Sequence, residues 1–187
     1  MTDPTEKPLQ TPSQTIGPFF AFGLPYEGGP QLVPGHSPDA IRLHGTVIDG
    51  AGEPIPDALI EIWQADERGR LPVVQGSLAR DGYTFTGFGR DATTRAGAYS
   101  FTTVKPGPVE GRAPYVLVTI FARGLTHHLF TRAYFDDEVD LNAADTLLSG
   151  LPESRRGTLI AVSDSPGSYR FDLRLQGDGE TVFLDFN

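Results

Sequence analysis

Short stretches in which apolar and polar residues alternate recur along the chain, separated by turns rich in glycine and proline. Side chains of a strand point alternately to its two faces, so each alternating stretch predicts a β-strand. The cleanest alternation, at 169–176, puts four apolar residues on one face: Tyr169, Phe171, Leu173 and Leu175. The turn 177–180 then predicts a hairpin into a last strand at 181–186. Alternation, or a content of β-branched and aromatic residues, predicts further strands at 41–49, 58–64, 98–104 and 115–122.

The stretch 98–124 contains two of these strands, separated by a proline-rich turn. Lys105-Pro-Gly-Pro108 cannot continue a strand, because proline has no backbone N–H to donate to a neighbour. The run 115–122 is almost wholly apolar and predicts a strand buried on both faces. Arg123 follows it, with the same parity as Tyr115 if the strand reaches that far. A charge at the end of a buried run must be paired or face a cavity, so Arg123 is a candidate functional residue.

Many short strands with little helix predict an all-β fold, an antiparallel β-sandwich with long loops and one or two short helical turns. The helical turns are expected at 143–148 and 152–156. A length of 187 residues fits one domain with a substantial core. We expect three parts: a mobile N-terminal segment at 1–10, an arm and loop at 11–40, and the β-sandwich at 41–187.

Composition narrows the classes of function. A formal net charge of −9 makes nucleic acids and anionic membranes poor partners. The chain has no cysteine, and therefore neither disulfides nor thiolate metal ligands. The N-terminus lacks a basic region followed by an apolar stretch, and no apolar run approaches the roughly 20 residues of a membrane helix. We therefore expect a soluble, cytoplasmic protein.

The side chains that commonly bind metals do not form a pattern that predicts a metal site. His127 and His128 are adjacent, so on a strand they point to opposite faces and cannot chelate one ion together. The acidic run Asp136-Asp-Glu138 lacks the spaced ligands and the glycine of a calcium loop, and we interpret it as a solvated loop. No nucleophile-elbow or phosphate-binding motif occurs either.

Three parts of the sequence resemble the intradiol ring-cleavage dioxygenases. They are the arm motif Thr11-Pro-Ser-Gln-Thr-Ile-Gly-Pro-Phe19, the hairpin that runs from Asp49-Gly to Glu61-Ile-Trp-Gln64, and the strand, proline turn and buried strand at 98–122. The resemblance covers essentially residues 11–187. It implies a β-sandwich and a reaction in which O2 cleaves an aromatic diol at a ferric ion.

The resemblance also implies that this chain has lost the iron ligands. In catalytic chains of the family, two tyrosines and a His-x-His pair hold the ion, and the matching positions here are Ser77, Val109, Tyr115 and Leu117. Valine and leucine have no donor atom, serine is a poor ferric ligand, and one tyrosine is not a site. The chain thus resembles the family's non-catalytic alpha chains, whose homologous beta chain holds the Fe(III). No catalytic residue and no metal are then expected in this chain alone.

An alpha chain would complete the beta chain's pocket for 3,4-dihydroxybenzoate and O2 in an alpha–beta hetero-oligomer. The resemblance places the arm and loop 11–40 at the partner interface and implies five substrate-binding residues: Thr15, Gly17, Pro18, Phe19 and Arg123. A guanidinium suits this task because it can donate two parallel hydrogen bonds to a carboxylate. Arg112 also matches a family position, and its role without an adjacent iron stays open.

Other interpretations stay open as well. The chain could be a stand-alone binding module, since the Asp-Gly-x-Gly-x-Pro-Ile hairpin also occurs in transthyretin-like sandwiches. An independent intradiol enzyme is opposed by the missing ligands. The plain alternative for the arm is a strap that covers the core, and for Arg123 it is a surface salt bridge.

Overall fold

The computed structural model describes residues 10–74 and 80–186. The α-helices in this part of the chain are α1 (Phe20–Gly23), α2 (Val139–Ala144), α3 (Thr146–Gly150) and α4 (Glu153–Arg156), and a 3-10 helix, η1 (Gly157–Leu159), follows α4. The strands are β1 (Ala40–Ile48), β2 (Leu59–Gln64), β3 (Phe88–Ala92), β4 (Ala98–Val104), β5 (Tyr115–Phe121), β6 (Leu129–Phe135), β7 (Ile160–Ser165), β8 (Ser168–Arg170) and β9 (Leu173–Arg174). Most of the segment predicted to be mobile, 1–9, and the position Ser77 lie outside the described residues.

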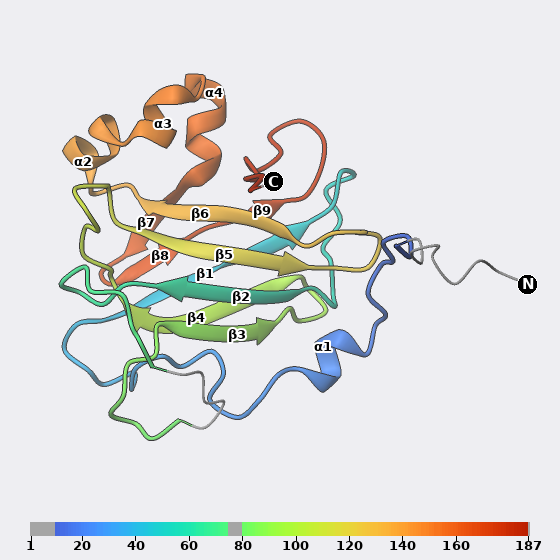
Figure 1. The fold of residues 1–187 in the computed structure, drawn as a ribbon, viewed down its shortest axis with the longest axis horizontal. Coiled ribbons are helices and arrows are strands. Elements are labelled where there is room, and N and C mark those ends of the chain that lie inside the picture. The colour runs from blue at the N-terminus through green and yellow to red at the C-terminus, as the bar shows by residue number, and fades with distance from the viewer. Residues whose placement is uncertain (1–9, 75–79, 187) are drawn as a thin grey trace, which may run out of the picture.

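The strands form one continuous hydrogen-bonded path in the order β3-β2-β5-β6-β7-β8-β1-β4, with β9 beside β1 (Figure 1). The predicted dominance of β structure is confirmed. The prediction that the sheet is antiparallel throughout is wrong, because β1 pairs in parallel with β8 and β9, and β6 pairs in parallel with β7. Strands β6 and β7 can pair in parallel because the helices between them, α2 to α4, carry the chain back to the start of the sheet.

One core cluster lies inside this folded path. It takes Leu43 of β1 and Phe101 of β4 from one end of the path, and Ile60 of β2 and Val118 of β5 from the other. All four side chains are almost completely buried. A smaller cluster, which includes Tyr134 and Leu148, lies under α2 to α4 at the end of the sheet where β5 begins (Figure 1). No helix in the described ranges is long and apolar enough to cross a membrane.

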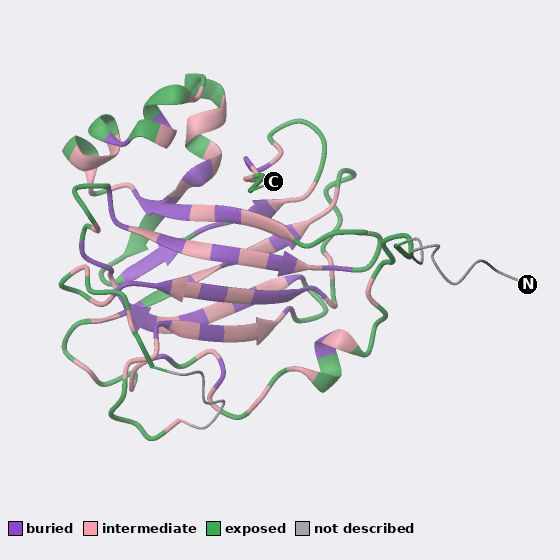
Figure 2. Ribbon diagram, viewed as in Figure 1, coloured by how far each residue is buried: buried purple, intermediate pink, exposed green. Residues whose placement is uncertain are grey.

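Strand β5 is buried on one face, whereas its sequence predicted burial on both. Val116, Val118 and Ile120 are buried, and the residues between them remain partly exposed. The same banding of buried and partly exposed residues is visible along β2 and β6 (Figure 2). The apolar run therefore supplies both a core face and an outer face that the described part of this chain leaves accessible.

The stretch 169–176 is broken in two, although its sequence predicted one strand. Its apolar residues do face inward, since Tyr169, Phe171 and Leu173 are buried. The carbonyl of Phe171, however, approaches β1 so closely that a Cβ on Gly45 would lie 1.9 Å from its oxygen. Asp172 then accepts a hydrogen bond from the backbone N–H of Thr46 at 2.9 Å, in place of a ladder bond. Because Gly45 has no side chain, the Phe171 carbonyl can approach this closely. The pairing with β1 is interrupted at this point, which divides the stretch into β8 and β9.

Two further predictions are corrected. The turn at 177–180 forms, with the N–H of Glu180 donating to the carbonyl of Gly177 at 2.9 Å, but it does not lead into a hairpin strand. The segment after it instead makes a single bridge from Leu184 to Phe130 of β6. In the described ranges there are four short α-helices and one 3-10 helix rather than one or two helical turns, and α1 lies in the arm, where no helix was predicted.

Candidate functional site

The pairing of β2 with β5 brings Arg123 to a specific partner. These antiparallel strands pair Leu59 with Phe121, and extending that register by two residues sets Asp57 opposite Arg123. Opposite residues of an antiparallel pair lie on the same face, close enough for oppositely charged side chains to meet. Arg123 Nε accordingly lies 2.5 Å from Asp57 Oδ2. The charge that follows the apolar run is therefore paired within this chain.

The two members of this ion pair differ in exposure. The side chain of Arg123 is 54% exposed, whereas that of Asp57 is only 11% exposed. Arg123 follows the end of β5 in a turn whose next residue, Gly124, has a φ of +90°, a conformation that glycine adopts without strain. The guanidinium thus lies at the surface, held from below by a nearly buried carboxylate.

The N-terminal arm docks at this same turn. The backbone N–H of Gly124 donates a hydrogen bond to the hydroxyl oxygen of Thr15 at 2.8 Å. The ring of Phe20 in α1 packs against Phe121 at the end of β5, with 5.5 Å between ring centroids. A cavity of about 200 Å³ between the arm and the turn before β6 is lined by Ile16, Phe20, Phe121, Leu125 and His128, among others. Two of the predicted site residues, Thr15 and Arg123, are therefore brought together.

The other predicted site residues are exposed on the arm. Gly17, Pro18 and Phe19 follow Thr15, and the ring of Phe19 is 83% exposed. Phe22, on α1, is 80% exposed. Aromatic rings that cover a core would be buried, so these two rings do not act as a strap over the core. Exposed aromatic residues are instead typical of surfaces that meet a partner.

Of the positions that match the lost iron ligands, Tyr115 and Leu117 lie at the opposite end of β5. Tyr115 begins the strand and Arg123 follows its last residue, so their separation is about 26 Å at ~3.3 Å per residue. Arg123 is therefore far from these positions of its own chain, because parity alone says nothing about distance along the strand. The sequence predicted a shared face only if the strand reached Arg123, and β5 ends at Phe121, two residues earlier.

The Tyr115 ring itself is packed against its neighbours and is not free to bind a metal. The guanidinium carbon of Arg132 lies 4.1 Å from the centroid of the Tyr115 ring, and the Tyr115 and Tyr134 rings are 5.7 Å apart. Arg132 also donates to the Tyr134 hydroxyl at 3.2 Å, and that hydroxyl donates to Asp145 at 3.3 Å. Burial raises the pKa of Tyr134 to about 12, so its phenol stays protonated near neutral pH.

The described residues at this end do not fit a ferric ion. Val109 and Leu117 carry no donor atom, and Leu117 pairs across β6 with Arg132, a cation. In the described part of the chain, no group of three or more His, Asp or Glu residues is arranged to hold a metal. Arg112 and Arg132 line an open cleft of about 550 Å³ here, together with Leu147, Leu151 and Phe186.

The acidic run Asp136-Asp-Glu138 is less solvated than predicted. Lys105 Nζ lies 2.8 Å from Asp137 and 2.6 Å from Glu138, and Tyr169 donates to Asp137 at 2.9 Å. Although burial opposes it, the hydrogen bonds from Lys105 and Tyr169 lower the pKa of Asp137. These bonds fasten the start of the Lys-Pro-Gly-Pro turn to the end of β6, which is a structural role.

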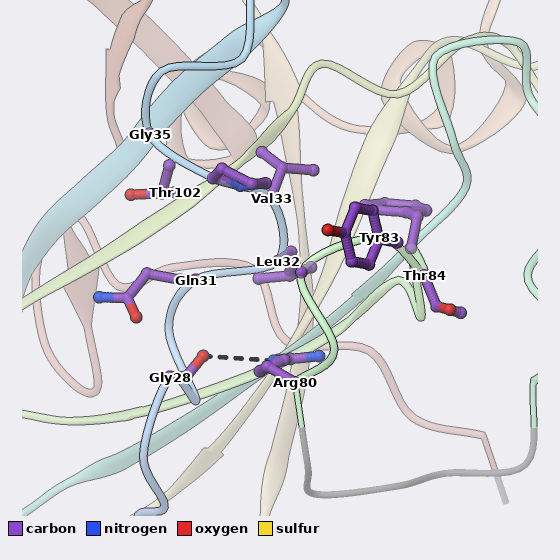
Figure 3. Close-up of a pocket in the computed structure, with 12 residues that line it drawn as sticks. Gly28, Gln31, Leu32, Val33, Gly35, Arg80, Tyr83, Thr84 and Thr102 are labelled. Carbon is purple, nitrogen blue, oxygen red and sulfur yellow. Dashed lines mark hydrogen bonds between the residues drawn. The ribbon is translucent and has the colours of Figure 1, made fainter.

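Among the described residues that line another cavity, Arg80 is the one with a charged side chain. This cavity has a volume of about 480 Å³ and lies between the loop 28–35 and the segment 80–85 (Figure 3). Arg80 donates to the carbonyl of Gly28 at 3.2 Å, to that of Gly29 at 3.0 Å and to that of Phe88 at 2.7 Å. Arg80 thus holds the loop 28–35 to β3. Because its N–H groups already donate to backbone carbonyls, we do not interpret it as a ligand-binding residue.

Sequence reasoning did not single out Asp57. Its neighbours Pro56 and Ala58 indicate only a turn before a strand. The signal would have been the pairing register of the strands 58–64 and 115–122, which makes Asp57 the residue opposite Arg123. Register is a property of two segments, and neither segment shows it alone.

Comparisons of the sequence and of the structure with known proteins point to one family. The sequence matches the family model described as Dioxygenase over residues 31–177. Among solved structures, the dioxygenase domain from Streptomyces sp. SirexAA-E is 28% identical with a TM-score of 0.59, covering 79% of this chain and 87% of that one. Catechol 1,2-dioxygenase from Acinetobacter sp. ADP1 shares the fold, with a TM-score of 0.55 at 20% identity over 84% of this chain and 60% of that one. The chain therefore belongs to the intradiol dioxygenase family.

Within the family, the similarity to one kind of subunit extends over nearly the whole chain. The protocatechuate 3,4-dioxygenase alpha chain of Burkholderia cepacia is 44% identical, covering 94% of this chain and 97% of the relative. The alpha chain of Pseudomonas putida is 41% identical, covering 98% and 100%. The beta chain of the Burkholderia cepacia enzyme is 31% identical, covering 80% and 63%. The resemblance seen in the sequence motifs is thus confirmed.

Proposed function

We propose that this chain is the non-catalytic alpha subunit of a protocatechuate 3,4-dioxygenase. It pairs with a homologous beta chain in a hetero-oligomer, and the pair inserts both atoms of O2 into 3,4-dihydroxybenzoate to give 3-carboxy-cis,cis-muconate. Support comes from the identity to two alpha chains over almost the whole length. The ferric ion, which makes the diol reactive towards O2, belongs to the beta chain. The donor-free residues Val109 and Leu117 support that assignment.

The observation that carries this proposal is the arm docked beside Arg123. Thr15 is tied to the turn that carries the arginine, while Phe19 and Phe22 are exposed and have no place in the core. An arm that served only its own chain would bury its aromatic residues, because burying such a ring is favourable by a few kcal/mol. We infer that the exposed arm inserts at the beta chain's pocket.

Each predicted site residue then has a task at that pocket. Arg123 binds the carboxylate of protocatechuate with paired N–H donors, as a planar guanidinium can. Thr15, Gly17, Pro18 and Phe19 line the substrate side and exclude water. A carboxylate clamp of this kind discriminates protocatechuate from catechol, which lacks the group that it binds.

The same proposal extends to the architecture. We infer that the folded sheet is a β-sandwich, with β3-β2-β5-β6 as one layer and β7-β8-β1-β4 as the other. The larger core cluster, which takes residues from both halves of the path, supports this description.

Co-expression of this chain with its beta chain tests the proposal. The two should purify as an equimolar complex that contains iron and cleaves protocatechuate. The isolated chain should self-associate, because the surface meant for the partner is exposed, and it should hold no stoichiometric iron. A monomer without affinity for the beta chain would favour a transthyretin-like binding module. One tightly held ferric ion per isolated chain would contradict the assignment of iron to the partner.

A further inference from the structure

We propose that Asp57 is a positioning residue that orients Arg123 for the substrate carboxylate. The inference rests on the proposed function of Arg123 and assigns a role to a residue that contacts no substrate. Its starting point is the ion pair between Arg123 Nε and Asp57 Oδ2.

The geometry of this ion pair leaves the guanidinium able to bind a second carboxylate. A guanidinium has two edges that match a carboxylate, one formed by Nε with a terminal nitrogen and one formed by both terminal nitrogens. The closest approach of Asp57 is to Nε. Asp57 therefore engages the inner edge, and the edge formed by both terminal nitrogens is the one that remains for a ligand.

Asp57 is the fixed member of the pair. The backbone around Asp57 is held at Ile55 and Ala58 by Thr93, which is buried. The hydroxyl of Thr93 accepts from the N–H of Ala58 at 2.9 Å and donates to the carbonyl of Ile55 at 2.7 Å. The N–H of Thr93 also donates to the carbonyl of Ala58 at 2.9 Å. The carboxylate thus has a rigid base, whereas Arg123 extends from an exposed turn.

A fixed anchor matters because an exposed arginine has many rotamers. Ordering such a side chain on ligand binding costs conformational entropy, and a preorganised side chain has lost that freedom beforehand. Two roles other than positioning are distinguishable. A surface salt bridge would contribute little to any property, and a competing carboxylate would weaken substrate binding rather than strengthen it.

The test uses the assembled alpha–beta complex and the variants Asp57→Ala, Arg123→Ala and the double variant. With O2 excluded, both protocatechuate and catechol bind but neither is cleaved, so calorimetry gives a Kd for each. Asp57→Ala should raise the Kd of protocatechuate about three- to tenfold, because a displaced binding group loses much of its contact. The Kd of catechol should not change. In the Arg123→Ala background, Asp57→Ala should have no further effect on either ligand.

Three more variants serve as controls. Glu53→Ala removes a carboxylate from the same β1–β2 connection and should leave both Kd values unchanged. This control separates the loss of the Asp57–Arg123 contact from the loss of one negative charge. Asp57→Asn keeps an acceptor without the charge and should give an intermediate Kd for protocatechuate. Asp57→Glu keeps the charge and should recover part of the binding. If Asp57→Ala does not assemble, Asp57→Asn and Asp57→Glu provide the same comparison.

Each contrary result has a distinct meaning. If Arg123→Ala weakens protocatechuate binding but Asp57→Ala leaves it unchanged or strengthens it, the positioning role is wrong and the proposed function stands. An equal loss for both ligands in Asp57→Ala would mean that Asp57 holds the fold or the interface, and would also overturn the positioning role. If Arg123→Ala changes neither Kd, the carboxylate clamp itself is wrong and the inference fails with it.

Discussion

The two ends of strand β5 differ in how many of their polar and aromatic side chains are exposed rather than engaged with neighbours. At the Tyr115 end, Arg132 lies on the Tyr115 ring and donates to Tyr134, which in turn donates to Asp145. At the other end, Arg123 is half-exposed and the arm that docks beside it presents bare aromatic rings. Under the proposed function, the Tyr115 end serves the chain's own packing, while the Arg123 end supplies the groups that meet the partner and the substrate.

The largest effect is expected from removing the arm. Deleting residues 1–19 from the assembled complex should lower kcat/KM for protocatechuate by about a hundredfold, because residues that position a substrate are lost. The melting temperature should barely change, since the arm contributes few buried side chains. Deletion of 1–10 alone is the matched control and should preserve activity. Full activity with a lowered melting temperature would instead identify the arm as a strap over the core.

A change at the Tyr115 end should have the opposite consequences. Asp145 is 3% exposed and accepts from the N–H groups of Leu147 and Leu148, which caps α3. Asp145→Ala should destabilise the fold by about 1–2 kcal/mol, as loss of a helix cap does. At about 2–4 °C per kcal/mol, calorimetry should show a clear fall in melting temperature. Asp145→Asn, which keeps an acceptor, should cost less.

Activity at a temperature where Asp145→Ala stays folded separates the two ends. The value of kcat/KM should match that of the wild type, because the proposed function assigns substrate binding to the Arg123 end. A loss of kcat/KM without a loss of stability would show that the Tyr115 end still serves the reaction, and the contrast between the ends would fail.

A smaller effect is expected at the point where the arm meets the turn. Thr15→Val removes the acceptor for the Gly124 N–H with almost no change in shape. A neutral hydrogen bond contributes about 0.5–1.5 kcal/mol, so KM for protocatechuate should rise about two- to tenfold. Thr15→Ser keeps the hydroxyl and should behave like the wild type. An equal rise of KM in both variants would point to the methyl group rather than the hydrogen bond.

The local sequence pattern predicted an element well where that element does not depend on residues elsewhere in the chain. The β-branched stretch 98–104 coincides with β4, and the proline turn ends that strand as expected. The stretch 169–176 failed because its break depends on Gly45, a residue of another strand. Helix α1 was missed for a similar reason: a four-residue helix has little intrinsic stability, and Phe20 gains its contact from Phe121.

The candidate site was predictable in part. Motifs in the sequence located Arg123 and the arm, and the structure brings Thr15 beside the turn that carries the arginine. The partner Asp57 and the distance between the two ends of β5 were not predictable from parity. Both depend on strand register and strand length, which become fixed only when β2 and β5 pair.

The most direct test of the account is the selectivity of the assembled enzyme for a carboxylate. The measurement is kcat/KM for protocatechuate and for catechol, in the wild type and in Arg123→Ala. Loss of a hydrogen bond to a charged group costs about 1.5–3 kcal/mol, so protocatechuate should lose about tenfold to a hundredfold and catechol almost nothing. Arg123→Lys should recover only part, because it keeps the charge but not the planar fork. An equal loss for both substrates would contradict the account, since Arg123 would then hold the structure or the interface rather than the substrate.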